Sequence, residues 1–238
     1  MMKVSFAGDR VMAVMAHPDD AELLCAGALA RAKKDGAAVA ICVMCRGDKG
    51  VAAGSAAADV VEVRQREARE ASEVLGAKLF WFGAADGELG DDIEARRKLI
   101  EIYRQFSPTL VITHASEDYH PDHRAAGAIA EAASWMCASR GHVTETKAIE
   151  QPPAVWIADT VNMSGFLPEI YIDVTEQLPI KKRMLSCHQS QLQRSDDTDF
   201  APLMELMTRQ AQARGSQAGV EAAEAFRSHQ AFKRIRAF

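Results

Sequence analysis

The chain has 238 residues, 48% of them hydrophobic and 26% charged, which is typical of a folded enzyme with a substantial core. Its formal net charge of −5 argues against non-specific nucleic-acid binding, which needs a basic face. No apolar run reaches the ~18 residues of a membrane span and the N-terminus lacks a signal-peptide core, so we expect a cytoplasmic protein without membrane partners.

Along residues 1–140, short apolar runs alternate with longer amphipathic stretches. The continuous apolar run 11–16 predicts a strand buried on both faces, and 21–34 predicts a helix that stops at Asp35-Gly36. The same patterns continue with strands at 39–44, 79–82 and 109–113 and helices at 59–75, 92–106 and 122–138. Such alternation predicts an α/β fold: a mostly parallel sheet covered by helices on both sides, in a Rossmann-like three-layer arrangement.

Residues 141–238 follow a less regular pattern. Strands are expected at 155–158 and 170–174, and helices at 176–193 and 201–214. Because no linker is long enough to divide the chain, we expect a single domain, 1–238. Within it, the first 140 residues should form the core that carries the site, and the remainder should complete the substrate pocket.

Two polar clusters directly follow predicted strands. The first is Ala-His-Pro-Asp-Asp-Ala-Glu at 16–22, after the first strand, and the second spans 114–124, after the fourth strand. Each cluster contains a His-Pro-Asp triplet. Ligands of parallel sheets gather at the carboxyl ends of the strands, so we expect the two clusters to meet there.

These side chains suit a catalytic metal ion. His17 and Asp20 are three residues apart at a turn entering a helix, so both can face one point. A third ligand from the second cluster, either His120 or His123, completes two histidines and one carboxylate. That set suits Zn²⁺ or Fe²⁺ and leaves positions open for water and substrate. Asp19, beside a ligand, is placed to act as a general base.

Other interpretations are weaker. A single His-Pro-Asp-Asp segment can be a turn in which an aspartate caps the next helix. Two such segments at equivalent strand ends favour a metal site over two unrelated turns. A dinucleotide-dependent oxidoreductase would need Gly-x-Gly-x-x-Gly after the first strand, where His-Pro-Asp-Asp stands instead.

The same residues carry a family resemblance. Ala-His-Pro-Asp-Asp at 16–20 and His-Pro-Asp-His at 120–123 resemble the signature motifs of the PIG-L (LmbE-like) family of zinc-dependent deacetylases, over nearly the whole chain. Asp48 stands where the family usually has glutamate. Tail motifs resemble the branch that contains N-acetylglucosaminyl-malate deacetylase of bacillithiol biosynthesis: Asp173-Val174, Lys181-Lys182, His188-Gln189-Ser190-Gln191 and Glu224-Ala225-Phe226.

The resemblance implies a role for each residue of the expected centre. His17, Asp20 and His123 match the family's metal ligands, and Asp19 matches its general base. The implied cofactor is Zn²⁺, with Fe²⁺ as the alternative in the cell, and the implied fold is Rossmann-like.

The resemblance also implies groups that act on the substrate. His120 matches the histidine that stabilises the oxyanion or protonates the leaving amine, with Asp122 as its orienting partner and a protonated ring as the expected form. Arg64, Asp86 and His188 match positions that contact substrate in relatives, and relatives vary between histidine and tyrosine at the last of these.

The implied activity is metal-dependent removal of an acetyl group from an N-acetylglucosamine-type conjugate, with N-acetylglucosaminyl-malate as one option for the small-molecule substrate. Relatives of this branch are often hexamers, so a homo-oligomer is expected. Two rival functions are a metal hydrolase of another amide or an ester, and a non-catalytic Rossmann-like binding module. The presence of every ligand and base position weighs against the binding module.

Overall fold

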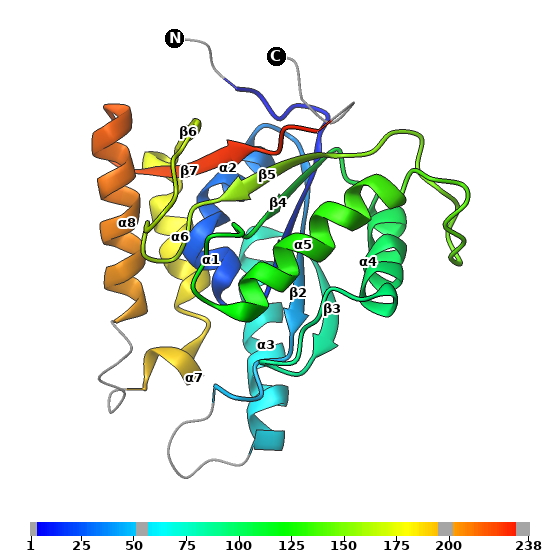
Figure 1. Ribbon diagram of the computed structural model, residues 1–238. Helices are drawn as coiled ribbons and strands as arrows, with labels where there is room; N and C mark the ends of the chain where they lie inside the picture. The colour runs from blue at the N-terminus through cyan, green and yellow to red at the C-terminus, as the bar shows by residue number, and fades with distance from the viewer. Residues whose placement is uncertain (1–3, 51–56, 195–201, 232–238) are drawn as a thin grey trace.

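The computed structural model describes residues 4–50, 57–194 and 202–231, which form a seven-stranded sheet in the order β3-β2-β1-β4-β5-β7-β6 (Figure 1). The first five strands in this order run parallel, whereas β7 is antiparallel to both of its neighbours. The predicted mostly parallel α/β sheet is therefore confirmed. The strands are β1 (Arg10–Met15), β2 (Ala38–Cys45), β3 (Lys78–Ala84), β4 (Leu110–Thr113), β5 (Ala154–Ala158), β6 (Ile170–Asp173) and β7 (Ala223–Ser228).

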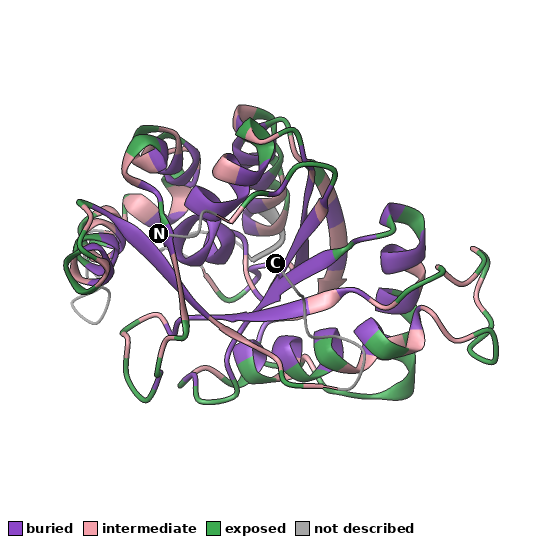
Figure 2. Cartoon of the chain, turned by 90° about the horizontal axis from the view of Figure 1, so that it is seen from above, coloured by how far each residue is buried: buried purple, intermediate pink, exposed green. Residues whose placement is uncertain are grey.

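Helices cover both faces of the sheet, and Figure 2 shows the buried strands between the two helical layers. Alternate residues of β1 face different cores: Val11 packs with one set of helices and Met12 with the other. One layer contains α1 (Asp20–Leu24), α2 (Ala26–Lys34), α3 (Ala57–Leu75), α6 (Leu178–Leu185) and α8 (Leu203–Ala218), and the other contains α4 (Ile93–Phe106) and α5 (Pro121–Met136). The predicted three-layer arrangement is thus confirmed.

Three features of the chain differ from the predicted elements. The helix expected at 21–34 is two helices, α1 and α2, separated at Cys25. The helix expected at 176–193 is a 3₁₀ turn (η1, Thr175–Gln177), α6 and the short α7 (Gln189–Leu192). Strand β7 was not predicted, because its buried Glu224 interrupts the apolar pattern. Within the described residues, no helix is both long and apolar enough to cross a bilayer.

A buried ion pair explains how the chain tolerates the break between α1 and α2. The Lys181 ammonium donates to the Leu23 carbonyl at 3.0 Å, near the end of α1, and to the Glu224 carboxylate. That carboxylate accepts the backbone N–H groups of Gly27 (2.8 Å) and Ala28 (2.6 Å), at the start of α2. Side chains from α6 and β7 therefore satisfy backbone groups that the break leaves without helical partners.

Replacing Lys181 by methionine is expected to lower the free energy of unfolding by about 3–5 kcal/mol, because Glu224 is left as an uncompensated buried charge. Replacing the neighbouring, partly exposed Lys182 by methionine is the matched control and should change stability by less than about 0.5 kcal/mol. Urea titrations of both variants measure the difference. Equal urea midpoints for the two variants would show that the Lys181–Glu224 pair does not stabilise the fold.

Candidate active site

The two polar clusters meet where β1 and β4 lie side by side in the sheet. Strand order reverses between these two strands, which opens a crevice beyond their carboxyl ends. His17 follows β1 directly, and His123 lies in the first turn of α5. Helix α5 begins at Pro121, whose fixed φ suits the first helical position. The topology therefore brings residues more than 100 positions apart to one point.

Three ligand atoms form a nearly equilateral triangle. His17 Nδ1 lies 3.4 Å from Asp20 Oδ2 and 3.2 Å from His123 Nε2, and the latter two atoms are 3.3 Å apart. Ligands bound at ~2.0–2.1 Å around a tetrahedral Zn²⁺ are separated by about 3.3 Å. The two imidazoles and one carboxylate expected from the sequence thus fit a zinc-sized divalent ion, with a fourth position open.

The neighbouring histidines are less suited to be ligands. His120 Nδ1 accepts the Asp122 backbone N–H at 3.2 Å. His114 Nε2 accepts the Ala16 N–H at 2.9 Å, and its ring stacks on His123 with centroids 4.1 Å apart. Burial lowers the pKa of His114 to about 4, so its ring is neutral at pH 7. Of the two third ligands that the sequence left open, this geometry favours His123.

Asp118 contacts His123 at Nδ1, the ring nitrogen that is not part of the triangle. Its Oδ1 lies 3.0 Å from His123 Nδ1 and accepts the His120 N–H at 3.0 Å, while Oδ2 accepts the Val161 N–H at 3.3 Å. A carboxylate on the outer nitrogen fixes the orientation of a ligating imidazole and raises its basicity. Sequence reasoning assigned Asp118 no role, because a loop aspartate two residues before His120 carries no periodic signal.

Asp118→Asn is expected to weaken zinc affinity about 10- to 100-fold, because the amide keeps the shape but loses the charge that supports His123. Zinc titration against a competing chelator measures the change. The exposed Asp91, which pairs with Arg96 and lies outside the cavity lining, supplies the control variant Asp91→Asn, for which affinity should stay unchanged. Unaltered affinity in Asp118→Asn would rule out its supporting role.

Asp122 contacts a different histidine from the one expected. Its Oδ2 lies 3.0 Å from His17 Nε2 and accepts the Gly87 N–H at 2.7 Å. The same oxygen is 4.0 Å from His120 Nδ1. The expectation that Asp122 orients His120 is therefore corrected: the Asp122 carboxylate orients His17, and only the Asp122 backbone N–H reaches His120.

The electrostatics of the triangle couple metal binding to protons. Although burial opposes it, hydrogen bonds with Asp122 and Asp20 raise the pKa of His17 to about 10. The charges of Asp20 and Asp118 likewise outweigh burial and raise the pKa of His123 to about 9. Without a metal, the two rings therefore hold protons more tightly than free histidine does, whereas ligation requires unprotonated nitrogens.

Zinc binding at pH 7 is accordingly expected to release at least about one proton, and affinity should increase with pH until the pKa values of both rings are passed. Calorimetric titrations in buffers of different ionisation enthalpy count the released protons. A count near zero would mean that the two rings are already neutral in the metal-free protein.

Asp19 occupies the turn between His17 and Asp20 in an unusual backbone conformation. Its φ is 115°, a region that residues other than glycine rarely adopt. The carboxylate is buried, and its Oδ2 lies 3.2 Å from the Arg64 guanidinium. Burial raises the pKa of Asp19 to about 6, against the opposing charge of Arg64. A carboxylate with a pKa near neutrality can accept a proton during catalysis.

The hydrogen bond to His120 also indicates where that ring carries its proton. Because Nδ1 accepts a backbone N–H, a neutral ring must be protonated on Nε2. Burial, followed by the charges of His17 and His123, lowers the pKa of His120. The structure therefore favours a neutral donor in place of the protonated ring expected from the sequence.

A cavity of about 590 Å³ opens beside the triangle. Arg64 and Asp86, two of the three residues expected to contact substrate, line it. His188 does not: its ring is fully buried, and its Nε2 lies 3.5 Å from Glu22 Oε2. The remaining lining residues include Lys49, Tyr119, His120, Val161, Asn162, Gln191, Arg194, Leu203 and Leu206.

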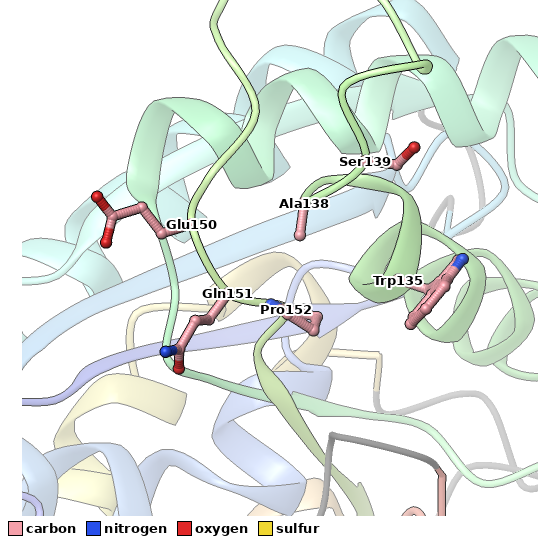
Figure 3. A pocket seen from close by; sticks show the side chains of 6 residues that line it. All are labelled: Trp135, Ala138, Ser139, Glu150, Gln151 and Pro152. Carbon is pink, nitrogen blue, oxygen red and sulfur yellow. The ribbon is translucent and has the colours of Figure 1, made fainter.

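A second hollow lies at the opposite end of α5. Figure 3 shows its lining residues, among them Trp135, Glu150 and Pro152. The 16 residues of α5 span about 24 Å, and the second hollow lies at the end far from the triangle. Its lining contains neither histidine nor cysteine, so the triangle and its cavity remain the candidate site.

Known proteins and a family model match most of this chain. A family model described as GlcNAc-PI de-N-acetylase, PIG-L, matches residues 12–134. The 4-oxalmesaconate hydratase of Pseudomonas putida is 26% identical over 87% of this chain and 80% of its own length. The 1D-myo-inositol 2-acetamido-2-deoxy-alpha-D-glucopyranoside deacetylase of Corynebacterium glutamicum is 28% identical over 75% of this chain and 76% of its own length.

Solved structures share the fold over almost the whole chain. The conserved protein TT1542 from Thermus thermophilus superimposes with a TM-score of 0.79 at 28% identity, covering 96% of this chain and 100% of that one. The 4-carboxy-2-hydroxymuconate hydratase GalB of Pseudomonas putida gives a TM-score of 0.81 at 24% identity, covering 96% and 99%.

Proposed function

Because the chain belongs to the PIG-L family of de-N-acetylases, we propose that it hydrolyses the acetamido group of an N-acetylglucosamine-type conjugate and releases acetate. One observation carries the proposal: the triangle of His17, Asp20 and His123 lies beside a buried carboxylate, Asp19, at one cavity. We propose Zn²⁺ as the ion, with Fe²⁺ as the cellular alternative, since two histidines and one carboxylate accept either.

His17, Asp20 and His123 would hold a divalent ion, which would polarise the acetamide carbonyl and acidify water. Asp19 accepts the proton of the attacking water, which its raised pKa favours. His120 donates through Nε2–H to the carbonyl oxygen as negative charge develops there. Asp19 then returns the proton to the departing amine. Asp122 and Asp118 hold the two ligating rings in place.

The cavity lining supports a polar substrate. The family resemblance implies contacts of Arg64 and Asp86 with sugar hydroxyls, and both residues line the cavity. The Asp86 carboxylate also accepts the backbone N–H groups of Gly47 and Lys49, and the Arg64 guanidinium pairs with Asp19. The cations Lys49 and Arg194 also line the cavity. They suit a carboxylated aglycone, so N-acetylglucosaminyl-malate is the first substrate to test.

A second candidate function is hydration of a carboxylated alkene. Two cationic side chains besides Arg64, those of Lys49 and Arg194, line the cavity, which suits a carboxylated substrate. The similar Pseudomonas putida protein is named a 4-oxalmesaconate hydratase. Such a reaction also requires activated water and a proton donor, so the same residues serve either chemistry.

One experiment separates the two functions. The zinc-loaded protein is incubated with N-acetylglucosaminyl-malate, with an N-acetylglucosaminyl inositol and, separately, with 4-oxalmesaconate. Acetate release that is lost on chelation and restored by Zn²⁺ or Fe²⁺ supports the deacetylase. Consumption of 4-oxalmesaconate without acetate release from either sugar supports the hydratase. A folded sample that binds no metal and turns over none of the three substrates contradicts both functions.

The same proposal includes a single-domain protein over residues 1–238, a cytoplasmic location and a homo-oligomeric state. The first is supported by the shared sheet, to which residues on both sides of position 140 contribute strands. Multi-angle light scattering tests the oligomer, with a mass near 25.9 kDa contradicting it and a sixfold mass indicating a hexamer.

A further inference from the structure

We propose that Arg64 is a positioning residue: its guanidinium holds Asp19 in a strained backbone conformation, and the glycines of the 46–50 loop make room for it. The inference rests on the proposed role of Asp19 as general base. It differs from the role that the family resemblance implies for Arg64, which is contact with substrate.

The contacts of Arg64 join three segments. Nη2 donates to the Pro18 carbonyl at 2.6 Å and to Asp19 Oδ2 at 3.2 Å, so one nitrogen holds both the backbone before Asp19 and the Asp19 side chain. Nη1 donates to the Gly47 carbonyl at 3.3 Å. Arg64 is 4% exposed, and it extends from α3 to a turn 45 residues earlier in the sequence. Lysine, which lacks the planar fork, cannot reproduce this set of donors.

The backbone of Asp19 needs such support. With φ at 115° and no side-chain hydrogen bond to the helix that follows, Asp19 adopts a conformation that glycine would accept more readily. Strained residues of this kind persist only where surrounding contacts fix them. The Leu23 N–H donates to the Asp19 carbonyl at 3.0 Å and fixes the peptide group that follows Asp19. Arg64 donates to the Pro18 carbonyl and fixes the peptide group that precedes Asp19.

The 46–50 loop is shaped around the guanidinium. A Cβ atom added at Gly47 would lie 2.6 Å from Arg64 Cδ, and one added at Gly50 would lie 2.6 Å from Arg64 Nη1. Asp86 holds the loop in this position through the Gly47 and Lys49 N–H groups. The glycines of the Gly-Asp-Lys-Gly segment at 47–50 therefore leave the space that the Arg64 side chain occupies.

Contact with substrate is the rival role. Arg64 lines the cavity, although its one unpartnered donor within the described residues, Nε–H, is itself buried. The two roles differ in their kinetics. Loss of a uniform substrate contact raises KM, whereas misplacement of the base lowers kcat with little change in KM.

The test uses two single variants, Arg64→Lys and Gly50→Ala. The added Cβ of Gly50→Ala displaces the Arg64 guanidinium without removing any charge. Gly90→Ala is the matched control, because Gly90 has open space around it and lies outside the cavity lining. Metal content and melting temperature report whether each variant is folded and loaded. Steady-state kinetics give kcat and KM separately, and crystal structures report the φ of Asp19.

Both Arg64→Lys and Gly50→Ala are expected to lower kcat on the order of 10²-fold, with KM within about threefold and metal content unchanged. Their crystal structures should show Asp19 displaced, whereas Gly90→Ala should match the wild type in every measurement. An undisturbed Asp19 in both structures, or a raised KM with unchanged kcat, overturns the inference. The crystal structures decide this even if the wild type releases no acetate, which would instead contradict the proposed function.

Discussion

Replacing Asp19 by asparagine is expected to lower kcat about 10²- to 10⁴-fold while one metal ion stays bound per chain, because a general base is lost and no ligand is touched. Asparagine is the informative substitution, since it tolerates a positive φ better than most residues and preserves the shape of the carboxylate. Acetate release under saturating substrate measures kcat, and elemental analysis measures the metal.

The alanine variant at the same position separates chemistry from strain. Asp19→Ala should lose as much activity as Asp19→Asn, but it should also be less stable, because a Cβ-bearing residue without a polar side chain fits φ of 115° poorly. Exposed Asp91→Asn provides the unaffected control. Near wild-type turnover in metal-loaded Asp19→Asn would show that Asp19 is not the base.

Loss of Asp20 should abolish both metal binding and turnover. Its Oδ2 lies within 3.4 Å of the nearest ring nitrogens of His17, His114 and His123 and accepts the His17 backbone N–H at 2.7 Å. Asp20→Ala therefore removes a ligand and the negative charge that balances the surrounding imidazoles. We expect substoichiometric zinc after purification and activity reduced at least 10³-fold.

The exposed His142 supplies a control for the ligand set. His142→Ala should keep one zinc per chain and full activity, whereas His17→Ala should behave like Asp20→Ala. If Asp20→Ala kept both its metal and its turnover, the triangle would be the wrong ligand set. The search would then turn to His114 or His120, which lie next to it.

Periodicity predicted the parallel strands well, because β1, β2, β4 and β5 are continuous apolar runs buried on both faces. The edge strand β3, which is buried only in part, still carries a short apolar run. The first four strands and the helices α3, α4 and α5 lie within a few residues of their expected positions. The helix prediction that was wrong in this region depends on side chains distant in the sequence. Nothing local in 21–34 reveals that Lys181 and Glu224 stabilise a break at Cys25.

Site prediction shows the same division between local and distant information. The two His-Pro-Asp segments predicted that His17 and Asp20 lie near either His120 or His123, because strand topology alone brings the loops after β1 and β4 to one crevice. The partners of these rings were not predictable in this way. Asp118 contacts His123 and Asp122 contacts His17, whereas the family resemblance implied His120 as the partner of Asp122.

The Lys181–Glu224 pair has a consequence for engineering. Helix α1, which begins with Asp20, is only five residues long, and its last turn is held by a side chain from the distant C-terminal third. The N-terminal segment that carries the metal ligands therefore cannot be combined with an arbitrary C-terminal segment. A chimaera that exchanges residues after 140 for those of a homologue, in order to change substrate preference, must carry over a matching lysine and glutamate. Otherwise the graft should assemble with an impaired metal centre, however well its new pocket suits the substrate.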